Sequence, residues 1–461
     1  MPTEYALFDI LIRTASQGNY TVDVRSVLGG DARSTFTPPF GNPTYDHFAK
    51  QLQDLETDED GLVELGQFLF HALFQGSIKD VYKLSQGGLK AGQGLRLRLD
   101  IDPALTEIIE LPWEFLYDPD RGPLATLNMS VVRYLSQQSA PAALATPLPI
   151  HVLLTGAATP PEPDVKRELD EVSKALAELE EAGYVKIHIE EHLTRTKLQR
   201  LLRGGFHIWH FIGHGARSKD GKSGTLVFED STGSAESISA RELGIYLDSS
   251  GVQLIVLDAC NSAKLTTDPY RSIAPALIRA HVPAVVAMQF TAPQEVTRAF
   301  AAEFYRTLAE GFPIDACVTE GRKAIIGATG LRRPDWGIPV IYTRAPDGNL
   351  FELPAAPSAS ASATRATNSG ASVSIGSGNV LQNSSSINIS NVGNTRIQND
   401  ERAEQIATLQ ELIRTNRRRL NQRQLQAEKY GIGVDPSISI EIEDLTKEIA
   451  KQERELKALG G

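Results

Sequence analysis

Cysteine is scarce in this chain of 461 residues, which has only two, Cys260 and Cys317. Two cysteines cannot build the framework of disulfides that staples many small secreted domains, so disulfides are excluded as the folding device. This cysteine usage favours a reducing cytoplasm, where a thiol nucleophile stays available.

Long apolar runs and an excess of positive charge are also lacking. No run of about 18 apolar residues occurs, so we expect no membrane span. The first residues, Met-Pro-Thr-Glu-Tyr, carry an acid early and no basic region ahead of an apolar core, so we expect no signal peptide. Lys and Arg number 46 against 57 Asp and Glu, a net charge of -11. That balance disfavours a general nucleic-acid binder.

What is present is a globular composition, at a length that predicts two or three units. Residues 1–146 mix alternating β-like runs with helical stretches and predict an N-terminal α+β portion. Residues 147–353 alternate short apolar runs with helical patterns, which predicts an α/β fold with a largely parallel sheet and helices on both faces. The predicted strands of this second part are 150–154, 185–189, 208–212, 254–257, 284–288 and 338–342.

Two of these strands end in reactive side chains. One runs into Gly-His-Gly at 213–215 and so delivers His214, and the other runs into Asp-Ala-Cys-Asn-Ser at 258–262 and delivers Cys260. Neighbouring parallel strands form a ligand-binding crevice at their carboxyl ends. A thiol and an imidazole in one crevice predict the catalytic pair of a cysteine protease.

The residues around this pair have predicted roles of their own. The backbone N–H of Gly215, with that of Cys260, predicts an oxyanion hole. Asp258 precedes Cys260 by two positions and therefore points to the same side of its strand. In that place it is predicted to line the pocket for the residue before the scissile bond and to favour Arg or Lys there. The alternative is a purely structural carboxylate that ties down the loop.

The histidines and cysteines of the chain also have structural interpretations. An isolated Cys260 would more often be a small buried residue, and only its pairing with a strand-end histidine favours catalysis. His207 and His210 come before the carboxyl end of their strand and are predicted to be structural. Cys317 lies in a helical run, 313–323, that contains no histidine, and is predicted to be a core residue.

The motifs around His214 and Cys260 resemble those of the caspase-like CHAT peptidases, which share a broad clan with caspases, metacaspases and separase. Further segments resemble the CHAT pattern and extend the likeness over most of residues 1–353. These segments lie at 111–119, 131–135, 282–290, 300–308 and 336–342. One departure is Ala263, where many relatives have Gly after the Ser.

The resemblance implies a caspase-like fold and a His214–Cys260 dyad that needs no metal and no organic cofactor. It implies a cysteine endopeptidase acting on protein substrates as a regulated effector in bacterial signalling, defence or programmed cell death. Metacaspase-like relatives read a basic residue with an Asp at the position of Asp258, whereas other CHAT proteins cleave after apolar residues. The alternatives are a catalytically silent scaffold and an oligomerising interaction protein.

The C-terminal part is predicted to recruit or assemble the enzyme. Residues 354–399 are rich in Ser, Ala and Asn and predict a linker, with short β-rungs that stack between chains as the alternative. Residues 400–461 predict a helical hairpin with a heptad seam that includes Ile442 and one polar position, Gln452. Such a hairpin predicts either an adaptor or sensor partner or a homo-oligomer.

Overall fold

The computed structural model describes residues 4–14, 20–53, 55–137, 139–159, 165–217, 224–248, 250–259, 270–290 and 292–353, with isolated positions between 442 and 457. The chain divides into two compact units, Met1–Thr364 and Arg365–Gly461. The predicted linker at 354–399 lies outside the described residues, and so does most of the predicted hairpin. Two residues of the predicted seam are described: Ile442 and Gln452 are both helical, and Gln452 is buried.

Parallel strands form the second half of the first unit, as the sequence predicts. Five of them lie side by side in the order β10-β9-β11-β14-β15, each parallel to the next. Their bounds are β9 Ile150–Gly156, β10 Val185–Glu190, β11 Ile208–Arg217, β14 Leu254–Ala259 and β15 Ala284–Met288. Strands with both faces covered carry continuous apolar runs, and β15 is buried at every position.

The first 146 residues extend this same sheet. β16, Pro339–Thr343, pairs antiparallel with β15 and parallel with β7, where Tyr342 lies opposite Arg133. From β7 the order continues β4-β1-β2-β3, and with β12 and β13, which branch from β11, the sheet has 13 strands within the described residues. The bounds are β1 Glu4–Thr14, β2 Tyr20–Ser26, β3 Gly30–Phe36, β4 Gln93–Ile101 and β7 Met129–Tyr134. The domain boundary at 146/147 stays a prediction, and it falls within one continuous sheet.

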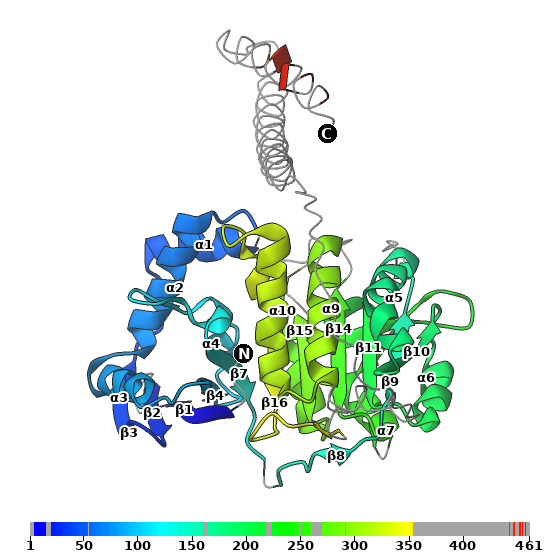
Figure 1. Ribbon diagram of the computed structural model, residues 1–461, viewed down its shortest axis with the longest axis horizontal. Helices are drawn as coiled ribbons and strands as arrows, with labels where there is room; N and C mark the ends of the chain where they lie inside the picture. The colour runs from blue at the N-terminus through cyan, green and yellow to red at the C-terminus, as the bar shows by residue number, and fades with distance from the viewer. Residues whose placement is uncertain are drawn as a thin grey trace, which may run out of the picture. The chain divides into compact units, whose positions relative to one another are not determined.

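Helices cover both faces of the second half of the sheet, which confirms the predicted α/β architecture (Figure 1). One apolar core joins α5, α9 and α10 to one face, and a second joins α6, α7 and α8 to the other. Alternate residues of a strand divide between the two cores: Ile208 and Ile212 enter the first, Trp209 and Phe211 the second. The bounds are α5 Val165–Glu181, α6 Arg195–Leu201, α7 Ala240–Leu247, α8 Tyr270–Arg279, α9 Gln294–Ala309 and α10 Ile314–Thr329.

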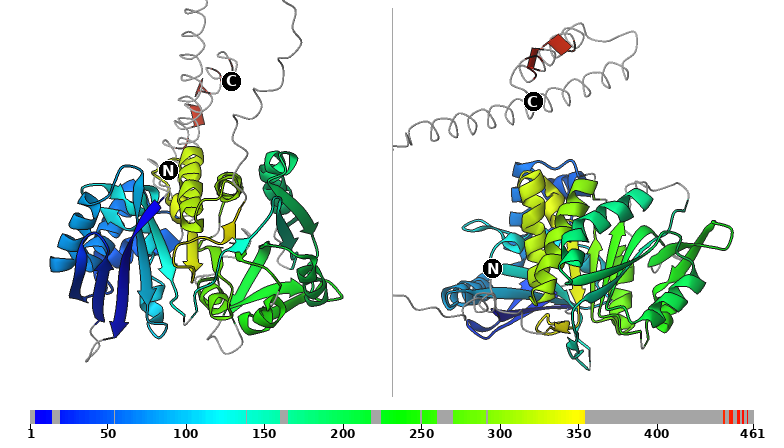
Figure 2. Two further views of the ribbon diagram at one scale, coloured as in Figure 1. Left: turned by 60° about the horizontal axis from the view of Figure 1, so that its bottom comes forward. Right: turned by 45° about the vertical axis from the view of Figure 1, so that its right-hand side comes forward.

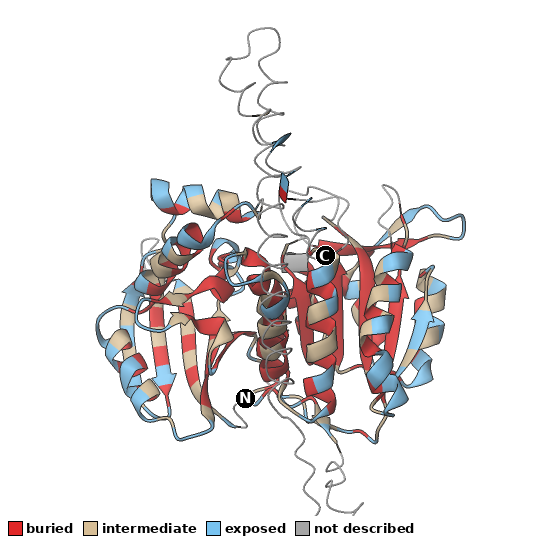
Figure 3. Ribbon diagram, turned by 45° about the horizontal axis from the view of Figure 1, so that its top comes forward, coloured by how far each residue is buried: buried red, intermediate tan, exposed pale blue. Residues whose placement is uncertain are grey.

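Buried strands lie between the helices, whose outer faces are exposed (Figure 3). Three further helices lie beside the N-terminal strands (Figure 2) and bury their apolar residues in the first core. They are α1 Pro43–Gln53, α2 Glu59–Leu73 and α3 Gly76–Gly87. Asp58 begins α2 by accepting a hydrogen bond from the Gly61 backbone N–H at 2.9 Å.

Short elements complete the unit. A hairpin of β12 Gly224–Glu229 and β13 Ala235–Ser239 extends from the carboxyl end of β11. The others are α4 Thr106–Ile109, β5 Tyr117–Asp118, β6 Gly122–Pro123, β8 Leu144–Ala145 and β17 Phe351–Glu352, and the 3-10 turns η2 Trp113–Phe115, η3 Leu124–Thr126, η4 Leu202–Gly204 and η5 Pro334–Gly337.

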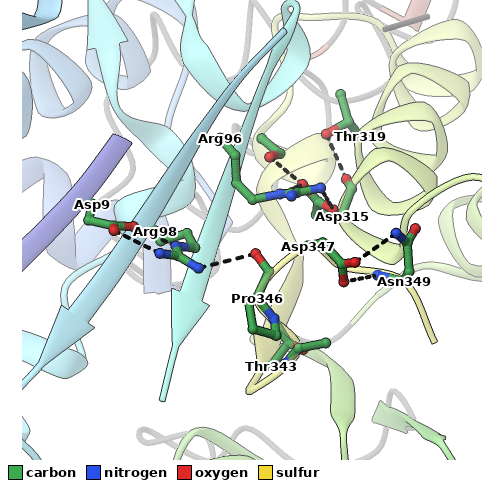
Figure 4. Close-up of polar contacts among 11 residues, drawn as sticks. Asp9, Arg96, Arg98, Asp315, Thr319, Thr343, Pro346, Asp347 and Asn349 are labelled. Atoms are coloured by element: carbon green, nitrogen blue, oxygen red, sulfur yellow. Dashed lines mark hydrogen bonds and ion pairs between the residues drawn. The ribbon is translucent and has the colours of Figure 1, made fainter. Parts of the chain in front are cut away.

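Buried and half-buried ion pairs fasten the N-terminal strands to the last part of the unit (Figure 4). Arg96 of β4 contacts Asp315 of α10 at 2.7 and 2.8 Å. Arg98 contacts Asp9 and also donates to the carbonyl oxygen of Pro346 at 3.1 Å. The contact with Pro346 thereby holds the segment 344–353 against the first half of the sheet.

Candidate active site

β11 and β14 lie side by side in the sheet, and each contains a predicted catalytic position or is followed by one in the sequence. The strands are parallel neighbours, and the last pair in their register is Gly213 and Ala259. His214 follows Gly213 and is half-buried. Cys260 follows Ala259 in the sequence and lies outside the described residues, as do the Asn and Ser after it. The register therefore places the residues directly preceding His214 and Cys260 opposite each other.

Gly215, the predicted oxyanion donor, is buried where β11 continues past the end of β14. There β11 pairs antiparallel with β12, with His214 opposite Val227 and Gly215 opposite Leu226. β12, which is itself paired with β13, thus holds the backbone from His214 onward, and β14 holds the residue before it, Gly213. The oxyanion role of Gly215 stays a prediction.

Asp258 lies on the face of the sheet that α9 covers, and it is 1% exposed. It has the same strand parity as Leu254 and Val256, which belong to the same core as Tyr305 of α9. Burial, and after it the nearby carboxylate of Asp258, raise the pKa of Tyr305 well above its ordinary range. The carboxylate therefore faces an aromatic hydroxyl in a closely packed interior.

His210 lies on the same face of β11 and contacts the same tyrosine. Its Nδ1 is 3.0 Å from the Tyr305 hydroxyl, and the two rings are stacked. Burial lowers the pKa of His210 to about 3, so the ring is neutral at physiological pH. His210 pairs with Val256, well before the carboxyl end of the strand, so it lies away from the predicted catalytic position His214.

A model of the CHAT domain matches residues 63–386, which is more than half of the chain. The chain belongs to the CHAT-domain family. No curated protein matches it.

Two solved structures resemble the CHAT chain at low identity. One is Saccharomyces cerevisiae separase in its complex with securin, at 12% identity and a TM-score of 0.38, over 73% of this chain and 30% of that one. The other is the Drosophila initiator caspase Dronc, at 10% identity and a TM-score of 0.27, over 48% of this chain and 92% of that one. The chain thus spans under a third of the separase chain that it matches.

The remaining His and Cys candidates of the CHAT domain lie away from the strand ends. His207 precedes β11, and its Nδ1 accepts a hydrogen bond from the backbone N–H of His151 at 3.0 Å. Burial and His151 lower the pKa of His207. Cys317 is fully buried in α10, and burial raises the pKa of its thiol far above the usual range. A thiol held protonated in a core is not a nucleophile.

The structure also assembles a group of polar residues that the sequence does not single out as a site. Glu114, Arg133 and Gln289 meet in the interior of the CHAT domain, although they are far apart in sequence. Each belongs to a segment that carries the CHAT resemblance: 111–119, 131–135 and 282–290. Their position in those motifs is the one sign of them that the sequence offers. That the three side chains contact one another is visible only in the folded structure.

Two absences concern the described part of the chain. No group of three or more His, Cys, Asp or Glu side chains that could hold a metal ion occurs among the residues that the structure describes. Within the same residues, no helix is both long enough and apolar enough to span a membrane.

Proposed function

We propose that this CHAT-family chain is a cysteine endopeptidase that uses His214 and Cys260 as its catalytic dyad. The observation that carries the proposal is the register of β11 and β14, in which Gly213 lies opposite Ala259. Each of these residues directly precedes a member of the dyad. Membership of the CHAT family supports the same assignment.

The proposed reaction is acyl transfer to sulfur. His214 takes the thiol proton of Cys260, and the thiolate attacks the substrate carbonyl carbon to form a C–S bond. The N–H groups of Gly215 and Cys260 stabilise the oxyanion. Protonated His214 then gives its proton to the leaving amine as the C–N bond breaks. Water hydrolyses the thioester, which releases the acid and regenerates the thiol.

Asp258 is proposed to bias cleavage toward Arg or Lys before the scissile bond. Two observations support this role: Asp258 comes two residues before Cys260 in the sequence, and it is buried near the end of β14. A buried carboxylate gains strongly from a guanidinium or ammonium partner and little from an apolar side chain.

We further propose that the enzyme is a regulated effector of bacterial signalling, defence or programmed cell death in the cytoplasm. The C-terminal hairpin at 400–461 would receive the signal through an adaptor or a second copy of the chain. The separate compact unit Arg365–Gly461 supports this division of labour.

The test uses purified full-length protein, a peptide library and a peptidyl probe that alkylates catalytic thiols. Cys260→Ala and His214→Ala should each lower cleavage at least about a thousandfold, because the two residues act as one unit. Cys317→Ala is the matched control and should retain the wild-type rate, since its thiol is buried. Probe labelling should fall on Cys260 and should require His214. Cleavage by Cys260→Ala at the wild-type rate would sink the proposal.

A further inference from the structure

A buried polar cluster of Glu114, Arg133 and Gln289 links the N-terminal portion to the end of β15. Arg133 donates to both carboxylate oxygens of Glu114, at 3.0 and 2.6 Å. The side-chain amide of Gln289 donates to Glu114 at 3.3 Å and to the backbone carbonyl of Gly337 at 2.6 Å. Exposure is 0% for Glu114, 3% for Arg133 and 1% for Gln289.

The cluster is charged despite its burial. Burial alone opposes ionisation of Glu114, but the Arg133 guanidinium outweighs it and holds the pKa of Glu114 below the usual range. The same carboxylate raises the pKa of Arg133 against the effect of burial. Arg133 is held further by donating to the backbone carbonyl oxygens of Ile109 and Leu111. Glu114 is thus a fixed acceptor, aimed at the amide of Gln289.

Gln289 stands beside the catalytic strand. Ala287 of β15 pairs with Leu257 of β14, and Gln289 lies as far beyond Ala287 as Ala259 lies beyond Leu257. Ala259 is the residue before Cys260. The backbone N–H of Gln289 donates to the carbonyl of Ile338 at 2.9 Å, so both its backbone and its side chain are anchored. These contacts hold the chain at the point where it leaves β15.

We propose that Gln289 is a positioning residue, through which Glu114 and Arg133 of the N-terminal portion set the edge of the proposed active site where the chain leaves β15, beside the end of β14. The proposal rests on the proposed peptidase function. It gives the N-terminal portion a part in turnover beyond its part in folding. Removing the amide should misplace the segment after β15, while β11 and β14, the strands that precede or carry the proposed catalytic positions, keep their places.

The decisive variant is Gln289→Met, which keeps the length of the side chain and removes its donors. The Glu114–Arg133 ion pair stays intact, so no buried charge loses its partner. Gln289→Asn is the second variant, because it keeps the amide but shortens its reach. Thr319→Val is the matched control: it removes one buried hydrogen bond, 3.0 Å to the carbonyl of Asp315 in α10, away from β15.

Three measurements on the full chain separate positioning from stability. Gln289→Met should lower kcat/KM on a peptide substrate by about 10- to 100-fold, the cost of a misplacement near 1 Å. Alkylation of Cys260 by iodoacetamide, which needs no substrate-binding edge, should stay within about twofold of wild type. Thr319→Val should lower the unfolding midpoint by about as much as Gln289→Met does, and it should leave kcat/KM unchanged.

Two results would overturn the proposal. One is a wild-type kcat/KM in both Gln289 variants, and the other is an equal loss in Thr319→Val at matched stability. Failure of the peptidase function itself looks different, because wild-type protein would then cleave nothing.

Discussion

Arg96 of β4 and Asp315 of α10 form a buried bidentate ion pair across 219 positions of sequence. Ser130 of β7 donates to the same carboxylate. The side chain of Arg96 is 5% exposed and that of Asp315 is 1% exposed. The pair joins the strands of the first 146 residues to a helix of the second half, so the two parts should unfold together.

Asp315→Asn should destabilise the whole unit by about 3–5 kcal/mol, because Arg96 would keep a buried charge without its counter-ion. Urea unfolding followed by tryptophan fluorescence measures the change. Glu59→Gln is the control: its partner Arg332 is largely exposed, and the substitution should cost less than about 1 kcal/mol. Separate transitions for the two parts in wild-type protein would contradict the expected joint unfolding.

Local pattern predicts most strands of the sheet, but it does not show the edge strand β3 or the order in which the strands pair. The apolar runs that became β9, β11, β14 and β15 are readable because burial on both faces demands uninterrupted apolar residues. β3 has the polar sequence Gly-Asp-Ala-Arg-Ser-Thr-Phe, since it is an edge strand with few buried positions. The pairing of β16 with β7 joins residues about two hundred positions apart, which no local period encodes.

The candidate site, too, has residues that local sequence predicts and contacts that it does not. His214 and Asp258 are placed on the predicted strands because each follows a buried run directly, whereas Cys260 lies outside the described residues. The partners of the buried charges could not be foreseen: the alternation in 95–101 is typical of a strand with one polar face, yet Arg96 is buried. Its counter-ion comes from a helix distant in sequence. The contact of His210 with Tyr305 is hidden for the same reason.

His210 should make stability depend on pH between neutrality and mild acid. Its pKa is about 3 in the folded protein against an ordinary 6.5, so the unfolded chain binds a proton that the folded protein does not. Stability is therefore lost as pH falls below about 6.5, by on the order of 2 kcal/mol at pH 5. His210→Gln keeps polar contact with Tyr305 but does not titrate.

The unfolding free energies of wild type and His210→Gln at pH 7.5 and pH 5 test this effect. The loss on acidification should be smaller in the variant by about 2 kcal/mol. Glu114, whose pKa is lowered from 4.5, gives up stability only at more acid pH and does not confound the range. His207→Gln should reduce the loss less, because His207 is only half-buried. Equal losses in wild type and His210→Gln would contradict the assignment.

Asp258→Asn should change which peptides are cleaved. The ratio of kcat/KM for a substrate with Arg before the scissile bond to one with Leu should fall at least about tenfold, because a buried carboxylate would no longer face the basic side chain. This ratio does not depend on the fraction of enzyme that is folded, so it separates specificity from a structural role beside Tyr305. Tyr305→Phe removes the neighbouring hydroxyl and serves as the control for packing. A wild-type preference for Leu or Met would reject the specificity role outright.

A chain that ends at Leu353 should keep the peptidase unit and lose its regulation. The cut spares the contacts that hold the end of the unit, where Leu144 N–H donates to the Leu350 carbonyl at 2.9 Å and Thr146 N–H to the Glu352 carbonyl at 3.0 Å. The unfolding midpoint and basal cleavage should therefore match those of the full chain. A chain that ends at Thr343 is the contrasting case, since it also loses the Arg98 contact with Pro346 and should be less stable.

Assembly and response to the natural trigger should disappear with residues 400–461, because tethering through them raises the local concentration of partner or second copy. Light scattering of the full and shortened chains, alone and with candidate partners, measures assembly. Cleavage in cells measures the response to the trigger. If the shortened enzyme is triggered as fully as the intact one, and peptide 400–461 stays monomeric and unbound, regulation must reside in the N-terminal portion. The Glu114–Arg133–Gln289 cluster would then be the physical route from that portion to the end of β15, the neighbour of the strand that precedes Cys260, because its members come from both places.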